Sequence, residues 1–493
     1  MMEPYLKLTS ISKNFNGFYA LKDIDFDIYP GEVHCIAGQN GCGKSTIIKV
    51  ISGVHQPDDG GKIEIEGKTY TSLTPIKSVR AGIQVIYQDL SLFPNLTVAE
   101  NIMINVYHSK KLRDSQGMVL EAQKVLNSME SSISPSELVE NLSISKCQLI
   151  AIARALAENA KLIIMDEPTA SLTHNEVEHL LSYVKLLKQK GIAIIFVSHK
   201  LDEVLEISDR FTVLKDGKLV TTCSAEEMTT QRLSELMTGQ NITFNPLSTS
   251  FSNEVVLECE HLTKQGQFYD INLKLHKGEV LAITGLLGSG RTELCLSLFG
   301  LNKQDSGQIS IAGKPVSFKN NREAISAGIG YVSEDRMGTG LVMEQPIIDN
   351  ISSTQFKSLQ PRLGLFQNGK AIQMVNKLIE QLKIKVGSPF DPVNTLSGGN
   401  AQRISIAKWL ATQPKVLILD SPTVGVDIAN KSGIYNIIKD LSQVGVSIII
   451  VTDEIEEAFN NSHSIAIVSE GRIKEHVNTS ETSPERLSEV IYA

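Results

Sequence analysis

The chain contains the same series of motifs twice, in the same order. The string GEVHCIAGQNGCGKST starts at Gly31 and recurs as GEVLAITGLLGSGRTE from Gly278. LSISKCQLIAIARAL from Leu142 recurs as LSGGNAQRISIAKWL from Leu396, and KLIIMDEPTASL from Lys161 recurs as KVLILDSPTVGV from Lys415. The repeat is far longer than the roughly 20–50 residues of a solenoid unit. Each copy is therefore predicted to be a complete domain.

The repeat predicts two domains, 1–240 and 254–493, joined by a linker over 241–253. The linker region is polar, has no apolar period and contains Pro and Ser. In each half, apolar runs such as IAIIFV and VSIIIV alternate with helical stretches, which indicates parallel βαβ units. The ranges 121–132 and 369–384 predict helices of a subdomain inserted into this α/β core.

Composition excludes several classes of protein. Hydrophobic residues make up 42% and charged residues 21% of the 493-residue chain, as in ordinary globular proteins. The net charge of −8 gives no support for a non-specific nucleic-acid binder. The six cysteines form no CxxC pair, so neither a zinc site nor a disulfide framework is predicted. Short apolar runs and the lack of a leader-like start predict a cytoplasmic chain whose membrane-spanning partners, if any, are other proteins.

The first half carries a phosphate-binding loop. Residues 38–45 fit GxxxxGK[ST], follow an apolar strand over 33–37 and precede an apolar helix from Ile47 to Ile51. The loop backbone directs N–H groups at phosphate, Lys44 supplies positive charge, and the Ser45 hydroxyl is a Mg²⁺ ligand. The predicted phosphate-binding residues are Gly38, Gln39, Asn40, Gly41, Cys42, Gly43, Lys44, Ser45 and Thr46.

Polar residues at the ends of other strands complete a candidate ATPase centre. In LIIMDEP, Asp166 is placed to hold Mg²⁺ through water and Glu167 to polarise an attacking water. His199 follows the strand IAIIFV and is a candidate γ-phosphate contact, and Gln88 is a candidate contact to the metal or the water. Outside this context a lone His or Gln would be read as a polar strand end.

This set of motifs resembles the nucleotide-binding domain of ABC ATPases, and the resemblance covers nearly the whole chain, twice. The resemblance implies two P-loop NTPase domains in tandem, each with a parallel-sheet core and an inserted helical subdomain. GRT in the second P-loop, EDR after YVS, and SGGN in place of SGGQ resemble the ATP-binding subunits of bacterial ribose, galactose and xylose importers.

The resemblance also implies composite sites, in which the P-loop of one half meets the LSGGQ-like loop of the other. Site one then combines Lys44, Ser45, Gln88, Asp166, Glu167 and His199 with Leu396, Ser397, Gly398, Gly399 and Asn400. Phe15 stands where the family stacks an aromatic ring on adenine; the alternative is an ordinary exposed or core phenylalanine. Ser45, Gln88 and Asp166 are the expected Mg²⁺ residues.

Site two departs from the family pattern at most functional positions. It is expected to combine Gly285, Gly288, Gly290, Arg291, Thr292, Glu334, Asp420, Ser421 and Asp453 with Ser143 and Ser145 of the first half. Arg291 keeps a positive charge, whereas Ser421 replaces the catalytic Glu and cannot act as a base near neutral pH. We expect one hydrolytic site and one degenerate site that binds nucleotide or stays empty.

The resemblance implies an ATPase, using ATP and Mg²⁺, that energises uptake of a sugar or sugar-like solute. Expected partners are integral-membrane permease subunits and a solute-binding protein, with no nucleic acid, and the expected location is the cytoplasmic side of the inner membrane. The alternatives are import of a nucleoside or signal molecule, a soluble tandem ATPase that acts on ribosomes or nucleic acid, and an ATP-sensing scaffold.

Overall fold

The chain forms two compact units in the computed structural model, Met1–Ile242 and Thr243–Ala493. The structure describes residues 3–39, 41–70, 72–107, 115–169, 172, 174–198, 200–239, 247, 249–286, 288–360, 366–426 and 428–492. Of the predicted site residues, Asn40 and His199 lie outside the described residues, as does much of the predicted linker.

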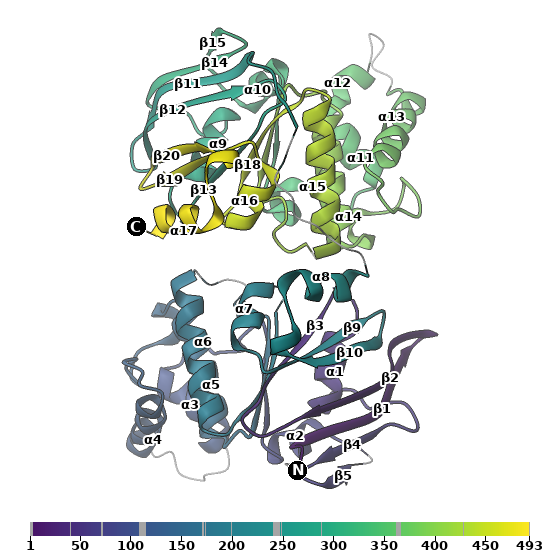
Figure 1. The fold of residues 1–493 in the computed structure, drawn as a ribbon, viewed down its shortest axis with the longest axis vertical. Helices are drawn as coiled ribbons and strands as arrows, with labels where there is room; N and C mark the ends of the chain where they lie inside the picture. Colours follow the sequence, from purple (N-terminus) through teal and green to yellow (C-terminus); the bar gives the residue numbers. More distant parts are fainter. Residues whose placement is uncertain are drawn as a thin grey trace. The chain divides into compact units, whose positions relative to one another are not determined.

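Two sheets form unit 1 (Figure 1). The antiparallel sheet has the order β2 (Phe18–Ile28), β1 (Leu6–Phe15), β4 (Lys62–Ile65), β5 (Lys68–Tyr70). The second sheet has the order β10 (Lys218–Ser224), β9 (Arg210–Lys215), β3 (Val33–Gly38), β8 (Ala193–Val197), β7 (Leu162–Asp166), β6 (Ile83–Ile86). Its strands are parallel except for β10, and β3 and β8 are buried along their whole length, as expected of continuous apolar runs.

Helices of unit 1 flank the parallel sheet and build a separate subdomain. They are α1 (Lys44–Ile51), α2 (Pro75–Arg80), α3 (Val98–Tyr107), α4 (Ser115–Ser128), α5 (Ile144–Ala157), α6 (His174–Gln189), α7 (Leu201–Ile207) and α8 (Thr230–Thr238). Between β6 and β7, the chain forms α3, α4 and α5, which pack on one another, so the predicted helical insertion is confirmed. The helix predicted over 121–132 is too long, because α4 ends at Ser128 and Glu130 has φ 56°, which a helix does not accept.

Unit 2 repeats this architecture. Its antiparallel sheet has the order β12 (Phe268–His276), β11 (Val255–Lys264), β14 (Ser306–Ile311), β15 (Lys314–Val316). Its larger sheet has the order β16 (Ile329–Val332), β17 (Val416–Asp420), β18 (Ser447–Val451), β13 (Val280–Gly285), β19 (Ser464–Ser469), β20 (Arg472–Asn478). The helices are α9 (Arg291–Leu298), α10 (Asn321–Ala327), α11 (Ile347–Ser352), α12 (Phe356–Leu359), α13 (Asn368–Gln381), α14 (Gly398–Leu410), α15 (Ile428–Gln443), α16 (Ile455–Asn461) and α17 (Pro484–Tyr492).

Strand order brings the predicted motifs together within each unit. In unit 1, β8 lies between β3 and β7, so the P-loop after β3 and the carboxylates after β7 share one edge of the sheet. Ligands of open α/β sheets bind at this carboxyl edge. The tandem parallel-sheet fold is therefore confirmed, and it places a candidate site at the same edge of each unit.

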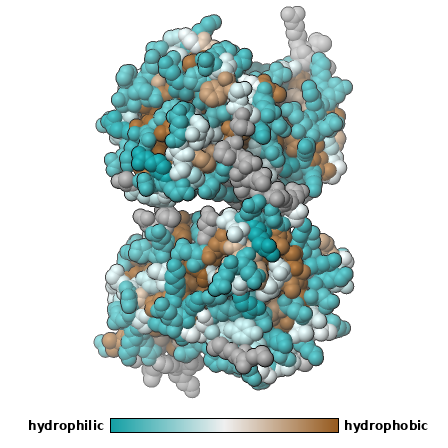
Figure 2. Space-filling view, in the orientation of Figure 1, coloured by the Kyte–Doolittle hydropathy of each residue, from teal (hydrophilic) through white to brown (hydrophobic). Residues whose placement is uncertain are grey.

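The surface of both units is largely polar on the visible face (Figure 2). No helix in the described part of the chain has the length and apolar character needed to cross a bilayer.

Candidate functional site

Glycines give the P-loop of unit 1 its shape. Gly38, Gly41 and Gly43 have φ of 158°, 80° and 109°, in or near the region that favours glycine. A Cβ on Gly43 would lie 2.5 Å from the carbonyl oxygen of Ala20 in β2. The loop thus passes close to the antiparallel sheet and feeds directly into the N-terminus of α1, where backbone N–H groups favour anions.

Lys44 is folded over the loop. Its buried Nζ donates to the carbonyl oxygens of Gly38, at 2.6 Å, and Gln39, at 3.0 Å. The charge is therefore held at the loop that would cradle phosphate. Ser45, the next residue, is exposed at the same helix start.

The carboxylates of unit 1 stand at the end of β7. Desolvation raises the pKa of Asp166, Glu167 raises it further, and Lys44 and Lys49 oppose the shift. Among the described residues, the Asp166 carboxylate has no side-chain hydrogen bond, and it is partly exposed. The Asp166 carboxylate and the Ser45 hydroxyl at the start of α1 stand at the same edge of the sheet, and oxygen donors of this kind fit Mg²⁺ held partly through water. Glu167 has φ 52°, and its N–H donates to the Val197 carbonyl at 2.8 Å, which fixes the start of its side chain beside β8.

Two further predicted residues of site one lie at element ends. Gln88 is exposed two residues beyond β6. Phe15 ends β1, is 41% exposed, and its ring centroid lies 5.3 Å from that of His55. Because β2 pairs with β1 and its Ala20 approaches Gly43, Phe15 belongs to the hairpin that borders the P-loop. Its stacking on adenine stays a prediction.

The P-loop of unit 2 has the same backbone shape as that of unit 1. Gly285, Gly288 and Gly290 have φ of 152°, 78° and 96°. Gly290 is the N-cap of α9, as Gly43 is of α1. The three glycines of the second loop therefore keep the backbone conformation of those in the first.

The side chains around the P-loop of unit 2 differ from those of unit 1. Arg291 is buried, and its Nη1 donates to the Thr452 carbonyl at 2.6 Å. Desolvation lowers the pKa of Arg291, while Asp453, Asp420 and Glu334 act against the shift. Desolvation, Asp420 and Asp453 raise the pKa of Glu334. The predicted acidic replacements thus gather around the arginine.

Tyr331 is a residue of the candidate site in unit 2 that the sequence patterns did not single out. Its hydroxyl donates to Asp420 Oδ2 at 2.6 Å, while the Thr292 hydroxyl donates to Asp420 Oδ1 at 3.4 Å. Asp420 is only 1% exposed. Tyr331 lies opposite Ile418 of β17, the place that Val85 holds opposite Ile164 in unit 1. The sequence shows a tyrosine in YVS where the first half has valine. That this tyrosine contacts Asp420 could be found only from the fold.

Unit 2 also lacks an aromatic residue at the hairpin that matches Phe15. Lys264 pairs with Asp305 at 3.5 Å, as Lys13 pairs with Asp58 at 3.3 Å in unit 1. Beyond Lys264 the hairpin carries only Gln265, Gly266 and Gln267 before β12.

The two LSGGQ-like loops begin α5 and α14. Ser143 caps α5, and its hydroxyl lies 2.9 Å from that of Ser145, so these two groups satisfy each other. Ser397 caps α14 and accepts from Asn400 Nδ2 at 3.0 Å. Ile144, in place of a glycine, is 54% exposed.

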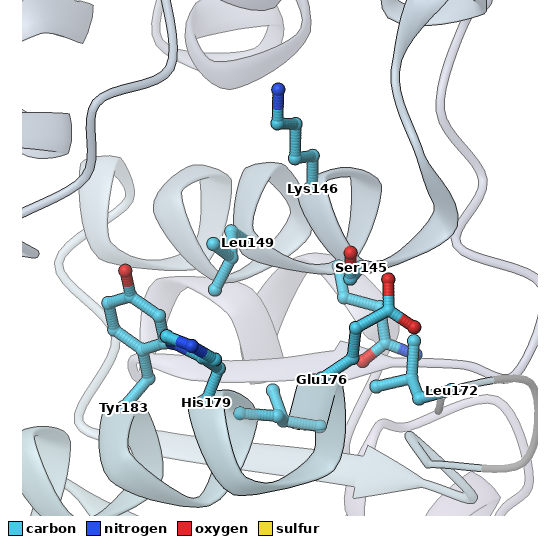
Figure 3. Close-up of a pocket in the computed structure, with 9 residues that line it drawn as sticks. Ser145, Lys146, Leu149, Leu172, Glu176, His179 and Tyr183 are labelled. Atoms are coloured by element: carbon cyan, nitrogen blue, oxygen red, sulfur yellow. The ribbon is translucent and has the colours of Figure 1, made fainter. Parts of the chain in front are cut away.

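A cavity of about 130 Å³ borders the loop of α5 (Figure 3). It lies between α5 and α6, with the Glu176 carboxylate directed toward Ser145 and Lys146 pointing away. Ligand pockets are typically about 300–1,000 Å³, so this space does not hold a nucleotide.

The glycine-rich loop at a helix start, the strand-end carboxylate and the parallel sheet define the class of P-loop nucleotide-binding proteins. Residues 21–170 and 268–424 match the family described as ABC transporter, and the chain belongs to this family. It therefore consists of two ATP-binding cassettes in tandem.

Full-length relatives place the chain more narrowly. It is 39% identical over 95% of its length to the ribose import ATP-binding protein RbsA of Geobacillus kaustophilus, covering 95% of that protein. It is 37% identical over 98% of its length to the protein of the same name in Bacillus subtilis, covering 98% of it. A putative ribose/galactose/methyl galactoside import ATP-binding protein of Agrobacterium fabrum is 37% identical over 98% of this chain and 96% of that protein.

Among solved structures, the RNase-L inhibitor is similar over 99% of this chain and 93% of its own, with a TM-score of 0.64 and 19% identity. At this identity the likeness shows the tandem fold alone.

Proposed function

We propose that this protein is the ATP-hydrolysing subunit of an importer for a sugar or sugar-like solute. The observation that carries the proposal is the end-to-end similarity to relatives named as ribose import ATP-binding proteins. The intact P-loop and strand-end carboxylates of unit 1 supply the chemistry that such a subunit needs.

Site one is proposed to hydrolyse ATP. The loop 38–43, Lys44 and Thr46 bind phosphates, while Ser45, Asp166 and Gln88 hold Mg²⁺, which would neutralise phosphate charge there. Glu167 polarises the attacking water, His199 contacts the γ-phosphate, and Phe15 stacks on adenine. Leu396, Ser397, Gly398, Gly399 and Asn400 complete the site from the other half.

Site two is proposed to be degenerate. Ser421 takes the position of Glu167 with a closely similar backbone, φ 46° against 52°, but a hydroxyl cannot act as a base near neutral pH. ATP then drives transport by favouring one arrangement of the two halves over another.

The proposed partners are permease chains and a solute-binding protein, without nucleic acid, and the proposed place is the cytoplasmic face of the inner membrane. The domain division, 1–240 and 254–493 with a linker between, is part of this proposal. Import of a nucleoside or signal molecule is an alternative outcome for the solute.

Purification of the tagged chain from membranes of its own cells tests the proposal. We expect co-purification of a polytopic membrane protein and ATP turnover that rises with the transported solute. Recovery with ribosomes would favour the soluble tandem ATPase, and ATP binding without turnover would favour the scaffold; either result would overturn the importer.

Single-turnover ATP hydrolysis tests the unequal sites. Glu167→Gln should slow hydrolysis by at least about 100-fold, the usual contribution of a general base. Ser421→Ala, the matched control, should leave the rate nearly unchanged. Equal losses from the two substitutions would refute the asymmetric scheme.

A further inference from the structure

The second P-loop retains the means to bind phosphate but not the place for a metal ion. Its glycines repeat the backbone conformation of the first loop, as the φ of Gly285, Gly288 and Gly290 show. Backbone N–H groups of such a loop hold phosphate oxygens whatever the neighbouring side chains are. The residues around Asp420 determine whether a cation can bind beside this loop.

In unit 2 the carboxylate that should face the cation is already satisfied. Asp420 accepts from the Tyr331 hydroxyl on one oxygen and from the Thr292 hydroxyl on the other, at 2.6 and 3.4 Å. It is 1% exposed, so solvent has little access to the carboxylate, whereas Mg²⁺ is usually held partly through ordered water. Asp166 in unit 1 is partly exposed and has no such bond to the described residues.

Tyr331 is held rigidly in this position. Its ring stacks on Phe299 with centroids 5.3 Å apart, and Phe299 in turn meets Trp409 edge-on at 5.2 Å. Moving the Tyr331 oxygen away from Asp420 would require the ring to move, which would disrupt this buried aromatic packing and leave a buried polar atom unpaired.

Arg291 takes the position of Lys44 and brings positive charge to the carboxylates of unit 2. It lies within electrostatic reach of Asp453, Asp420 and Glu334 and is anchored to the Thr452 carbonyl. Both oxygens of Asp420 already accept from protein hydroxyls, so the carboxylate of unit 2 does not fit Mg²⁺ in the way that Asp166 of unit 1 does.

We propose that the degenerate site binds the phosphates of a nucleotide without a metal ion, and that Tyr331 is the residue that excludes the metal. The proposal rests on the proposed function for the existence of two nucleotide sites. It adds a chemical difference between them that is independent of hydrolysis.

Equilibrium dialysis of the full chain tests this, with the non-hydrolysable β,γ-imido analogue of ATP and Mn²⁺ as a probe for Mg²⁺. We expect two nucleotides and one Mn²⁺ per chain. When EDTA removes the metal ion, one nucleotide per chain should remain bound. The Arg291→Ala substitution should abolish the binding of this remaining nucleotide. Two Mn²⁺ per chain, or only one nucleotide, would overturn the proposal.

Tyr331→Phe keeps the stacked ring and removes only the hydroxyl, so it should fold normally. We expect it to raise the count from one Mn²⁺ to two. Tyr435→Phe, which changes a tyrosine of α15 elsewhere in unit 2, should leave one. A count of one in Tyr331→Phe would show that Tyr331 does not exclude the metal. The counts do not depend on turnover or transport, so a failure here is distinct from a failure of the proposed function.

Discussion

At the scale of single residues, the two halves differ by side chains set on matching backbones. The N–H of Glu167 donates to the Val197 carbonyl at 2.8 Å, and the N–H of Ser421 donates to the Val451 carbonyl at 2.9 Å. Both residues have a positive φ, in the left-handed region of backbone conformation. The loss of the carboxylate at position 421 is thus a change of chemistry without a change of local fold.

Ser421→Glu should therefore be accepted without strain but should not restore a second hydrolytic site. The backbone already has the required conformation, whereas Asp420 beside it remains bound to Tyr331. We expect a melting temperature close to that of the parent and no gain of ATP hydrolysis in a Glu167→Gln background. Recovery of more than about a tenth of the parent rate, which is about 1.4 kcal/mol short of full activity, would show that the missing carboxylate is the only defect.

Glu457 is a second residue whose surroundings differ between the halves. It is buried and accepts from the Thr423 hydroxyl at 2.8 Å. Burial, followed by the charge of Glu454, raises its pKa to about 7, while Lys431, Thr452 and Thr423 oppose the shift. In unit 1 the matching residue is Glu203, and the position of Glu454 is taken by Lys200. The Lys200 Nζ lies 3.2 Å from Glu203 Oε1.

This raised pKa predicts a pH-dependent stability. A carboxyl with a raised folded-state pKa contributes stability at low pH that is lost as the pH rises through about 7. The side chain of Glu457→Gln cannot ionise. The free energy of unfolding of this variant, minus that of the parent, should therefore increase from pH 5 to pH 8. The gain should be on the order of 2 kcal/mol, since one pKa unit is worth about 1.4 kcal/mol. Urea unfolding at both pH values measures it, and parallel pH profiles would contradict it.

At the scale of elements, the start of α14 depends on close packing against α15. A Cβ on Gly399 would lie 2.3 Å from Cγ of Asn430 and 2.5 Å from its Cβ. The matching residue of unit 1 is Ser145, which borders the cavity next to α6 instead. Only the loop of α14 is therefore glycine-lined and tightly packed.

Gly399→Ala should displace the start of α14 and lower ATP turnover by about 10-fold or more, because the loop of α14 belongs to the proposed site one and a small misplacement in a catalytic site is costly. Adding Asn430→Gly removes both the Cγ and the Cβ that an alanine at 399 would meet, and should recover most of the turnover. Ser145→Ala, the matched change in unit 1, should have little effect. Full activity of Gly399→Ala, or no rescue by the second substitution, would contradict this account of the packing.

At the scale of the whole molecule, each unit has its own sheets and its own buried core. One apolar cluster lies within unit 1, from Tyr5 to Leu214, and another within unit 2, from Val256 to Val468. Units of this size with separate cores can fold alone.

A fragment over 1–242 should therefore unfold cooperatively and bind ATP through its intact P-loop. Its turnover should be lower than that of the full chain by about 10-fold or more, because it lacks the Ser397 loop that would complete site one. Circular dichroism and ATPase assays measure both properties, and Lys44→Ala in the fragment serves as the control for binding. A fully active fragment would refute a composite site.

Sequence patterns alone were sufficient for the tandem α/β fold, and they located the P-loop and the strand-end carboxylates that the fold brings to one sheet edge; the roles of these residues in site one stay predictions. A P-loop, a buried strand and a strand-end carboxylate are local signals, because their backbone and burial follow from neighbouring residues. The extent of α4 was missed because its end depends on a single left-handed residue, Glu130.

The contacts between the residues of the second candidate site depend on tertiary structure. Sequence alone showed that Arg291, Glu334, Ser421 and Asp453 depart from the family pattern, but not what they contact. Tyr331 meets Asp420 across 89 positions, and Arg291 meets Thr452 across 161. Such contacts follow from the register of β16 on β17 and from the place of β18 beside β13, and no local pattern contains that information.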